Sequence, residues 1–515
     1  MKFNIGSKCF SLLMLHALIF CFISANAQVY HGFNHKYPAK ELQQDLRILR
    51  EGFLKIHPGV FWYQDSLSFE KTYQSDYSSL TTESNLNDFA KIILPFVAQI
   101  RCGHTSLDLP APMWNYVIDS TLWFPFSIKI IKERVYIFKN FSNDSLIPVG
   151  TEITSINGES IPKILASMRN YMSAESDGQN NTAVFTGIQE RFGIFINFIN
   201  NYKWSVYDLN LVEPFGKTKS MLVNGIPHKQ MIANEKVRYP LSVNAEEDPF
   251  HYTVIDSLNT EVMTINAFNH LAIYDADTTH KKIENYKTFL KDHFTQIQSK
   301  NIKHLIIDLR NNGGGTGEAY LYSFLALKPF QWIKNIELTL NPKDTIFKYG
   351  SIDQDWVLQC YNHNELNQIS ERKYLIKGWD DDSHTMPMDL VSHKPLQPNK
   401  PIFKGDVYIL TSNKTFSAAS DFASIAQFNK RAKIIGQEAG GGAAGNTSGG
   451  FFSLKLPNTG FVVYIPVAKC ELAVKNNELG RGVMPDMEVT PTIDDLLSKK
   501  DLELNAALKM ISSKK

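Results

Sequence analysis

Ser417 has the sequence surroundings of a nucleophile. It follows a buried-type strand pattern at 407–410, and the small residues at 418–420 open a helical pattern that runs to Phe428. Small residues leave room for a substrate to reach the hydroxyl, and the positive end of a helix favours developing negative charge. The N–H of Ala418 could then donate to an oxyanion, as in other serine-nucleophile turns. The alternative role is a plain N-cap serine, which is common in proteins.

A glycine-rich loop is the second candidate for chemistry. The sequence Asp-Leu-Arg-Asn-Asn-Gly-Gly-Gly at 308–315 ends an apolar run that begins at Ile302. Successive glycines let backbone N–H groups approach a ligand closely, which suits phosphate binding or an oxyanion hole. Phosphate binding is disfavoured, because no Gly-Lys-Ser/Thr follows and Glu318 stands where a dinucleotide fingerprint requires glycine. The other possible interpretation of this loop is a tight strand-to-helix turn with no chemical role.

The elements around these loops predict an α/β core. Short apolar runs alternate with amphipathic helical patterns, which is typical of a mostly parallel sheet with right-handed crossovers. The expected strands are 262–265, 302–309, 407–410 and 434–435, and the expected helices are 280–297, 318–327 and 416–428. Both candidate loops follow a strand, so they belong to the carboxyl edge of the sheet, where ligands gather in such folds.

The chain before residue 229 predicts two further regions. Residues 39–100 are mostly helical in pattern, with a break at His57-Pro58. A compact module is expected over about 120–228, with strand-like runs, an Asn-Gly turn within Gly150–Gly158, helices over 161–202 and a hairpin over 206–223. Residues 328–400 look like an irregular insertion, and the Lys-rich end at 499–515 like a surface helix.

Composition excludes several classes of protein. The 515 residues are 43% hydrophobic with 53 Lys+Arg and 52 Asp+Glu, so a disordered chain is excluded and no charge block indicates nucleic acid. Residues 1–27 have the pattern of a secretory signal peptide: Lys2 and Lys8, an apolar run, and Ala-Asn-Ala at 25–27. A membrane anchor is the alternative, but the run is short. After its removal we expect no membrane anchor.

Cysteine usage gives no sign of a disulfide scaffold or a zinc site. Cys102, Cys360 and Cys470 remain after the signal, and neither CxxC nor HExxH occurs. Cys102 is expected to be a small buried apolar residue rather than a nucleophile.

Four ordered motifs resemble those of the tail-specific (C-terminal processing) and tricorn-core serine protease family. They are 308–315, Phe416–Ser420, Arg431–Glu438 and Gly482–Asp486. Cys102-Gly103-His104-Thr105 is similar to the Gly-His-Thr of the tricorn-like branch, and the 120–228 module is similar to the family's PDZ-like domain. The resemblance implies a ClpP/crotonase-like core, peptide or protein substrates and no metal or organic cofactor.

The resemblance assigns roles to individual residues. Ser417 matches the nucleophile, and Gly314 (or Gly313) and Ala418 match the oxyanion-hole backbone. The tail-specific branch has a lysine base about 11 residues after the arginine that aligns with Arg431, but that position here is Gly442.

The tricorn-like branch instead uses a histidine near the N-terminus, and His104 matches it. Imidazole titrates near neutrality and can accept and return a proton, so we expect an acid limb at a pKa of roughly 6–7. Gly103 departs from the serine of that branch, and Glu478 is the candidate third residue although its spacing to Gly482 is one too long. Lys414 is the next candidate base.

We therefore expect an exported serine endopeptidase of the α/β class with several domains. The expected divisions are a signal peptide at 1–27, a helical region at 28–119, a PDZ-like module at 120–228, a protease core at 229–498 with the insertion, and a tail at 499–515. The alternative is a catalytically inactive family member on the same fold that binds peptides or apolar ligands, since the interphotoreceptor retinoid-binding protein of this family binds apolar ligands. The oligomeric state, the substrate sequence and the choice between periplasm and medium are open.

Overall fold

The structure is a computed structural model. It describes residues 33–172, 177–240, 250–269, 279–339, 343–352, 366–370, 373–376, 395–475 and 478–514. The expected signal peptide and Cys360 lie outside these ranges. Within them, no helix has the length and apolar character needed to cross a bilayer.

Three helices form the N-terminal region, as the sequence predicts. They are α1 (Ala39–Ile56), α2 (Ser66–Ser79) and α3 (Leu86–Ala98). Helix α1 ends where His57-Pro58 begins, because a residue before proline is disfavoured in helical conformation. The side chains of Asp65 and Asn85 cap α2 and α3 by accepting from backbone N–H groups of the first turn.

The module that follows is an antiparallel sheet with its own apolar core. Its strand order is β3-β4-β5-β7-β8, with β6 paired to β5. The elements are β3 (Phe126–Ile131), β4 (Arg134–Asn140), β5 (Glu152–Ile156), β6 (Glu159–Ser160), α5 (Ile161–Arg169), α6 (Asn181–Ile199), β7 (Val206–Val212) and β8 (Thr218–Asn224). The predicted hairpin is confirmed as β7 and β8, and Asn157-Gly158 forms the turn between β5 and β6 with positive φ at both residues.

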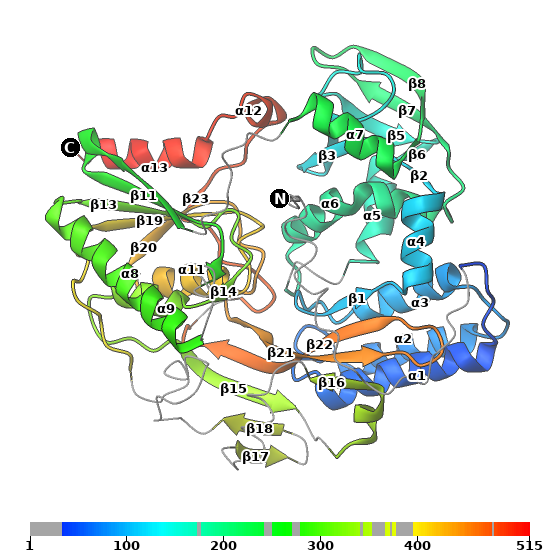
Figure 1. Ribbon diagram of the computed structural model, residues 1–515, viewed down its shortest axis with the longest axis horizontal. Helices are drawn as coiled ribbons and strands as arrows, with labels where there is room; N and C mark the ends of the chain where they lie inside the picture. The colour runs from blue at the N-terminus through cyan, green and yellow to red at the C-terminus, as the bar shows by residue number, and fades with distance from the viewer. Residues whose placement is uncertain are drawn as a thin grey trace, which may run out of the picture.

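The central sheet is mostly parallel, which confirms the βαβ prediction. Its order is β10-β11-β13-β19-β20-β23, and only β10 runs antiparallel to its neighbour. The strands are β10 (Phe250–Ile255), β11 (Thr260–Ile265), β13 (His304–Asp308), β19 (Asp406–Thr411), β20 (Ala432–Gly436) and β23 (Met487–Glu488). Helices α8 (Thr279–Ser299), α9 (Glu318–Ser323) and α11 (Ala418–Phe428) lie on one side of this sheet (Figure 1).

The C-terminal segment covers the other side of the sheet. Helix α13 (Leu502–Ser512) places Ala507 and Ile511 against Ile306 and Tyr408, and both α13 residues are fully buried. Alternate residues of a strand point to opposite faces, so a parallel sheet needs an apolar cover on each side. The surface helix predicted at 499–515 is thus confirmed as α13, and the structure adds that one of its faces packs on the sheet while Lys509 stays exposed.

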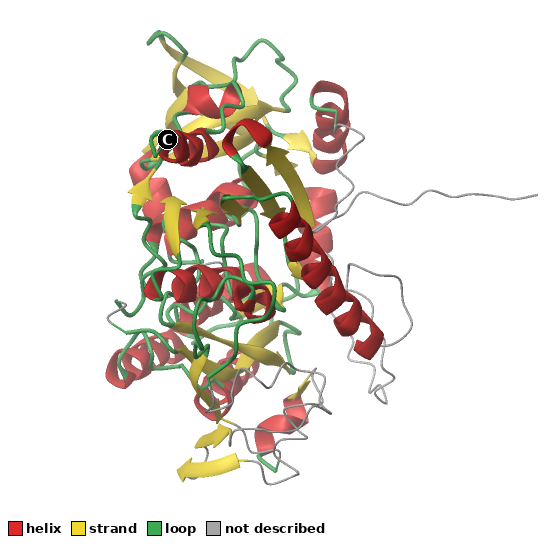
Figure 2. Ribbon diagram, turned by 90° about the vertical axis from the view of Figure 1, so that its left-hand side faces the viewer, coloured by secondary structure: helices red, strands yellow, loops and turns green. Residues whose placement is uncertain are grey.

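A second, seven-stranded antiparallel sheet supports the first. Its main path is β16-β21-β22-β15-β18-β17, and β1 (Ser106–Asp108) pairs with β22. The other strands are β15 (Ile333–Thr339), β16 (Gly350–Ile352), β17 (Leu366–Ser370), β18 (Lys373–Ile376), β21 (Gly445–Lys455) and β22 (Val462–Leu472). The region 328–400, expected to be irregular, thus supplies four strands. The module and the β17–β18 hairpin lie at opposite ends of the molecule (Figures 1 and 2).

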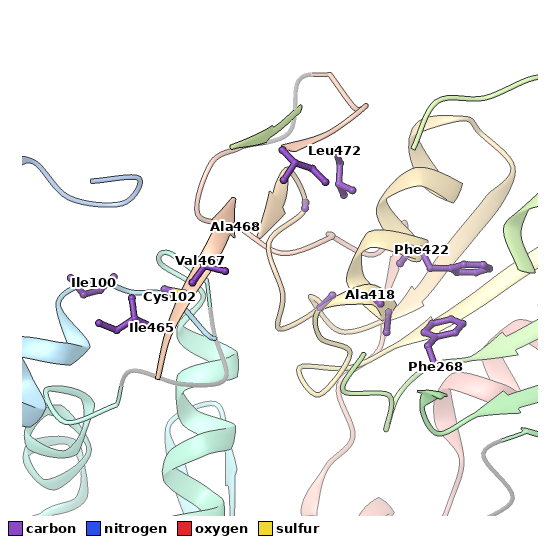
Figure 3. Packing of buried hydrophobic residues seen from close by; sticks show 14 of the residues in the cluster. Ile100, Cys102, Phe268, Ala418, Phe422, Ile465, Val467, Ala468 and Leu472 are labelled. Carbon is purple, nitrogen blue, oxygen red and sulfur yellow. The ribbon is translucent and has the colours of Figure 1, made fainter. Parts of the chain in front are cut away.

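One large apolar core connects the N-terminal helices with both sheets. Figure 3 shows Ala418 and Phe422 of α11 beside Phe268, and Ile100 beside Ile465 of β22. The core therefore holds the start of α11 and the segment after α3 in one rigid body, and these two segments carry the candidate nucleophile and the candidate base.

Candidate active site

Ser417 lies at a sharp turn between β19 and α11. Its backbone has φ 52° and ψ −129°, and the helix begins at the next residue. A positive φ is costly for a residue with a Cβ and persists only where the surroundings enforce it, which is common at active sites. The turn presents the hydroxyl at the helix N-terminus, as a strained strand-to-helix nucleophile turn does.

Hydrogen bonds join the nucleophile turn to the glycine loop. Thr415 Oγ1 donates to the carbonyl of Leu309 at 2.8 Å, and the Phe416 N–H donates to the carbonyl of Asn312 at 3.0 Å. Ser420 Oγ, one turn into the helix, donates to the Thr415 carbonyl at 2.8 Å. Both loops at the carboxyl edge of the sheet therefore form one unit.

His104 meets Ser417 in this structure. Its Nε2 lies 3.0 Å from Ser417 Oγ, although 313 positions separate the two residues in the chain. The ring also packs beside Phe416, with ring centroids 4.7 Å apart. Burial lowers the pKa of His104 to about 4, because a charged imidazolium is poorly solvated there. The imidazole is therefore neutral near neutral pH, and Nε2 can accept the hydroxyl proton when Nδ1 carries the hydrogen.

No described residue orients the far side of that ring. His104 Nδ1 is buried without a hydrogen-bond partner among the atoms described. Glu478, the candidate third residue, is exposed, and its one described hydrogen bond is from the Arg481 N–H to its backbone carbonyl. The structure therefore does not bring Glu478 to His104. Its expected role came from an imperfect spacing, and the turn before Gly482 points it to solvent.

Two buried side chains hold the residues on either side of His104. His57 Nδ1 accepts from the Gly59 N–H at 3.1 Å, so its Nε2 carries the hydrogen and donates to Thr105 Oγ1 at 3.1 Å. On the other side, Asp177 Oδ1 accepts from the Gly103 N–H at 2.9 Å.

Asp177 also links the histidine segment to the loop beside the nucleophile. Its Oδ2 accepts from the Gly442 N–H at 3.1 Å, and the neighbouring Gly441 packs against the Ser417 backbone nitrogen. Burial raises the pKa of Asp177 to about 6, opposed by these two N–H donors. Sequence reasoning missed both His57 and Asp177, because each is distant in the chain from the residues it contacts.

The glycine loop lies directly against Ser417. Gly314 has φ 113°, and a Cβ placed on it would lie 2.6 Å from Ser417 Cβ. Its N–H, expected to be an oxyanion donor, donates to Asn312 Oδ1 at 2.8 Å, so in this structure that donor is occupied. Gly313 is exposed with open space before it, and Ala418 is the first residue of α11, whose N–H has no carbonyl to reach within the helix.

The lysine alternatives lose support from the geometry. Lys414 forms an ion pair with Glu190 of α6, and no described hydrogen bond joins its amine to Ser417. At Gly442 a Cβ would lie 2.5 Å from the Gly445 carbonyl oxygen, so this loop has no room for a lysine.

Cys102 is buried and hydrogen-bonded to Thr447 Oγ1 at 2.7 Å, and burial raises the pKa of its thiol to about 11, as expected for a structural thiol rather than a nucleophile.

Among the side chains that the structure describes, no group of three or more His, Cys, Asp or Glu is arranged to hold a metal ion. The groups that the structure brings to the Ser417 hydroxyl are the His104 imidazole and backbone N–H donors.

Comparisons with known proteins agree with that chemistry. The model of Peptidase family S41 matches residues 262–489. No curated protein matches the sequence. Among solved structures, mature CPAF has a TM-score of 0.60 at 16% identity, covering 92% of this chain and 98% of that one. Mature CPAF complexed with lactacystin has a TM-score of 0.59, also at 16% identity and with the same coverage, 92% and 98%.

At this identity the structural likeness establishes a shared fold, which extends over nearly the whole of both chains. The family assignment comes from the matched segment, which contains the glycine loop, Ser417 and the 482–486 motif. Residues 262–489 therefore form a Peptidase family S41 domain, and the protein that carries this domain is a serine-type peptidase.

Proposed function

We propose that this protein is an endopeptidase of the tricorn-like branch, with Ser417 as nucleophile and His104 as general base and acid. The observation that carries the proposal is the 3.0 Å contact between Ser417 Oγ and His104 Nε2. Such a contact is within reach for proton transfer, and it pairs a strained serine with a half-buried, neutral imidazole.

The first half of the reaction forms an acyl-enzyme. Ser417 Oγ attacks the peptide carbonyl carbon, its proton moves to His104 Nε2, and the carbonyl oxygen becomes an oxyanion. The N–H groups of Ala418 and Gly313 are the proposed donors to that oxyanion, since the Gly314 N–H is bonded to Asn312. When the carbon–nitrogen bond breaks, His104 returns the proton to the leaving amine. Water then repeats the sequence and releases the acid.

The module at about 120–228 is proposed to be PDZ-like and to bind substrate beside the core. A cleft of about 850 Å³ lies between them, lined by β3, α6, the turn before Ser417 and the segment 488–503. Strand β3 is the edge of its sheet, where an extended peptide can add as a further strand. The Ile130 N–H on that edge now donates to Gln189 Oε1 at 3.1 Å, so a peptide has to displace that amide.

We also propose that the protein is exported, on the signal-peptide pattern at 1–27, and that its core is ClpP/crotonase-like. Export is tested by sequencing the N-terminus of the protein recovered from the cell envelope or medium. A terminus at Gln28 supports cleavage after Ala27, whereas an intact Met1 contradicts it.

The main test is labelling with an alkyl fluorophosphonate, followed by peptide mapping. We expect the probe on Ser417, no labelling in Ser417→Ala, and unchanged labelling in Ser79→Ala, which alters an exposed serine on α2. The same Ser417→Ala protein should lose peptide hydrolysis at unchanged thermal stability. A wild-type protein that folds but neither labels nor cleaves would favour the non-catalytic binding protein. The observation that supports this alternative is His104 Nδ1, which has no described hydrogen-bond partner to orient the ring.

A further inference from the structure

A half-buried lysine lines the cleft of about 850 Å³ between the module and the core. This residue is Lys129 of β3, on the side of the module that faces the core (Figure 1). Its ammonium lies over the ring of Phe138, 5.1 Å from the centroid, and its cross-strand neighbour on β4 is Tyr136. Among the residues that the structure describes, no carboxylate forms an ion pair with Lys129. The sheet therefore gives this cation aromatic neighbours but no counter-ion.

The other charges of the cleft differ from Lys129. Most basic side chains of the lining have carboxylate partners: Arg310, Lys414, Arg481 and Lys500. The remaining charged side chains of the lining form no ion pair with a described residue, and they are exposed: Lys132, Glu133, Glu488 and Lys499. Water solvates exposed charges well, so they need no partner. Lys129 is thus the charge of this lining that is both shielded from water and without an ion pair.

The electrostatic surroundings of Lys129 favour an anion. Burial lowers the pKa of Lys129, the nearby Lys414 lowers it further, and Glu190 opposes both effects. Glu190 is already paired with Lys414. The first turn of α6, at Asn181 and Thr182, lines the same cleft and contains no acidic side chain. Because the N-terminal end of a helix carries positive partial charge, this turn also attracts a negative group. A carboxylate that enters the cleft would therefore meet several positive groups and stabilise the charged lysine.

The backbone of β3 determines which side chain of an added strand would meet Lys129. Strand β3 pairs with β4, and no described strand pairs with its other edge. The Ile130 N–H points to that open edge, since it donates to Gln189 Oε1. Backbone groups of successive residues point to alternate edges, so Lys129 is a non-hydrogen-bonded position toward an added antiparallel strand. Residues opposite each other at such positions lie closest, with Cα atoms about 4.5 Å apart.

We propose that the module selects peptide segments that carry an acidic residue: an extended segment adds to β3 and places a Glu or Asp side chain opposite Lys129. The inference rests on the proposed peptidase function and names its substrate class. Asn311 of the glycine loop and Lys414, three positions before Ser417, line the same cleft, so a chain held on β3 lies beside the nucleophile turn. Lys129 is then a specificity-determining residue that takes no part in the chemical steps.

The test measures which peptides the full-length Ser417→Ala protein retains, since this variant lacks the proposed nucleophile and should leave them intact. The probes are two decapeptide libraries with random uncharged residues, which differ only at a fixed fifth position, Glu in one and Gln in the other. The libraries compete in one mixture, and mass spectrometry gives the ratio of Glu to Gln peptides retained. We expect a ratio of about five, the upper end of what an opposite-charge cross-strand pair contributes.

Substitutions of Lys129 test whether this lysine causes the preference. In the Ser417→Ala background, Lys129→Met should bring the ratio to about one, because methionine keeps the apolar stem without the charge, and Lys129→Arg should preserve it. Lys139→Met is the matched control, since Lys139 is a half-buried lysine of β4 that also lies over a ring, 5.5 Å from the centroid of Tyr239. It pairs with Glu235 and lies outside the cleft lining, so the ratio should not change. Partial unfolding cannot mimic the result, because both libraries compete for the same folded sites.

Three results overturn the inference: a ratio near one without the Lys129 substitution, a ratio of about five that survives Lys129→Met, or no retention of either library. Fluorophosphonate labelling of Ser417 tests the peptidase function separately, because that probe has no peptide chain to occupy the cleft. Labelling together with any of these three results leaves the peptidase function standing. A wild type that neither labels nor cleaves would refute the peptidase function, and with it the inference that acidic segments are substrates.

Discussion

Adding one methyl group at Gly314 should disable the active site, and the structure supplies a control for the backbone part of the effect. Gly314 has φ 113°, and a Cβ there would lie 2.6 Å from Ser417 Cβ and 3.1 Å from its Oγ. Gly158, in the turn of the module, has φ 79°, and a Cβ there meets nothing within 4 Å. Gly158→Ala therefore carries the positive-φ strain alone, and Gly314→Ala carries strain together with a clash.

The two contributions have different expected sizes. A positive φ costs a residue with a Cβ about 1–2 kcal/mol of folding free energy. Forcing a methyl group into a packed site costs about 1–3 kcal/mol more, so Gly314→Ala should destabilise the protein by about 2–5 kcal/mol. Relief of the clash moves Ser417 relative to His104, and a displacement of about 1 Å can cost about 100-fold in rate.

The assay combines urea unfolding with peptide hydrolysis at a temperature where both variants are folded. Gly158→Ala should lose about 1–2 kcal/mol and keep wild-type kcat/KM, whereas Gly314→Ala should lose more stability and at least about 100-fold in kcat/KM. Equal destabilisation in the two variants, or wild-type kcat/KM in Gly314→Ala, would show that the glycine loop does not press on the nucleophile as described.

The remaining predictions concern titrating groups around the site. The ¹³Cε1 NMR signal of His104, assigned by its loss in His104→Ala, should titrate near pH 4, because burial lowers the pKa of the imidazole to about 4. A titration midpoint at pH 6–7, the value expected from the sequence alone, would contradict that burial. Asp177→Asn should lower kcat/KM about tenfold or more at pH 8, because the single oxygen of an amide cannot replace both carboxylate oxygens as acceptors for the Gly103 and Gly442 N–H groups. The control is Asp45→Asn, which changes a buried carboxylate of α1 and should leave kcat/KM unchanged. Unchanged kinetics in Asp177→Asn would leave Asp177 a purely structural role. Burial lowers the pKa of His57 to about 3, below the unfolded value of about 6.5, so its contribution to stability is complete above pH 6.5 and is lost as pH falls toward 3. His57→Gln should remove up to about 1.4 kcal/mol per pH unit from that acid slope in urea unfolding, and identical slopes would refute the linkage.

Much of the core could be read from local pattern. Apolar runs bounded by glycine and polar turns predicted the strands around 304–308, 406–411 and 432–436, because strands of a parallel sheet are buried on both faces. Helix α13 was predicted as a surface helix, but the packing of Ala507 and Ile511 against the sheet was not foreseen. The antiparallel pairing of β15 with β22 was not foreseen, because it joins two segments that are distant in the chain.

Some residues of the site could likewise be predicted from the sequence, and others could not. The sequence by itself determined the strand-to-helix turn at Ser417 and the glycine loop, since each depends on neighbours within a few positions, but it assigned their catalytic roles, and excluded a lysine base at 442, only through the family resemblance. It proposed His104 only through a family resemblance, and it proposed Glu478, which the structure leaves at the surface.

Only the tertiary structure decided which distant groups meet. Strand β1 pairs with β22 in a fixed register, with Ser106 opposite Tyr464, and the segment before it brings His104 to Ser417. The Asp177 bonds and the Asn446 pairing with Asp421 depend on the same assembly. Such contacts arise where separate elements bury their apolar faces together, and the position of a side chain across that interface depends on the packing of both partners rather than on the local sequence of either.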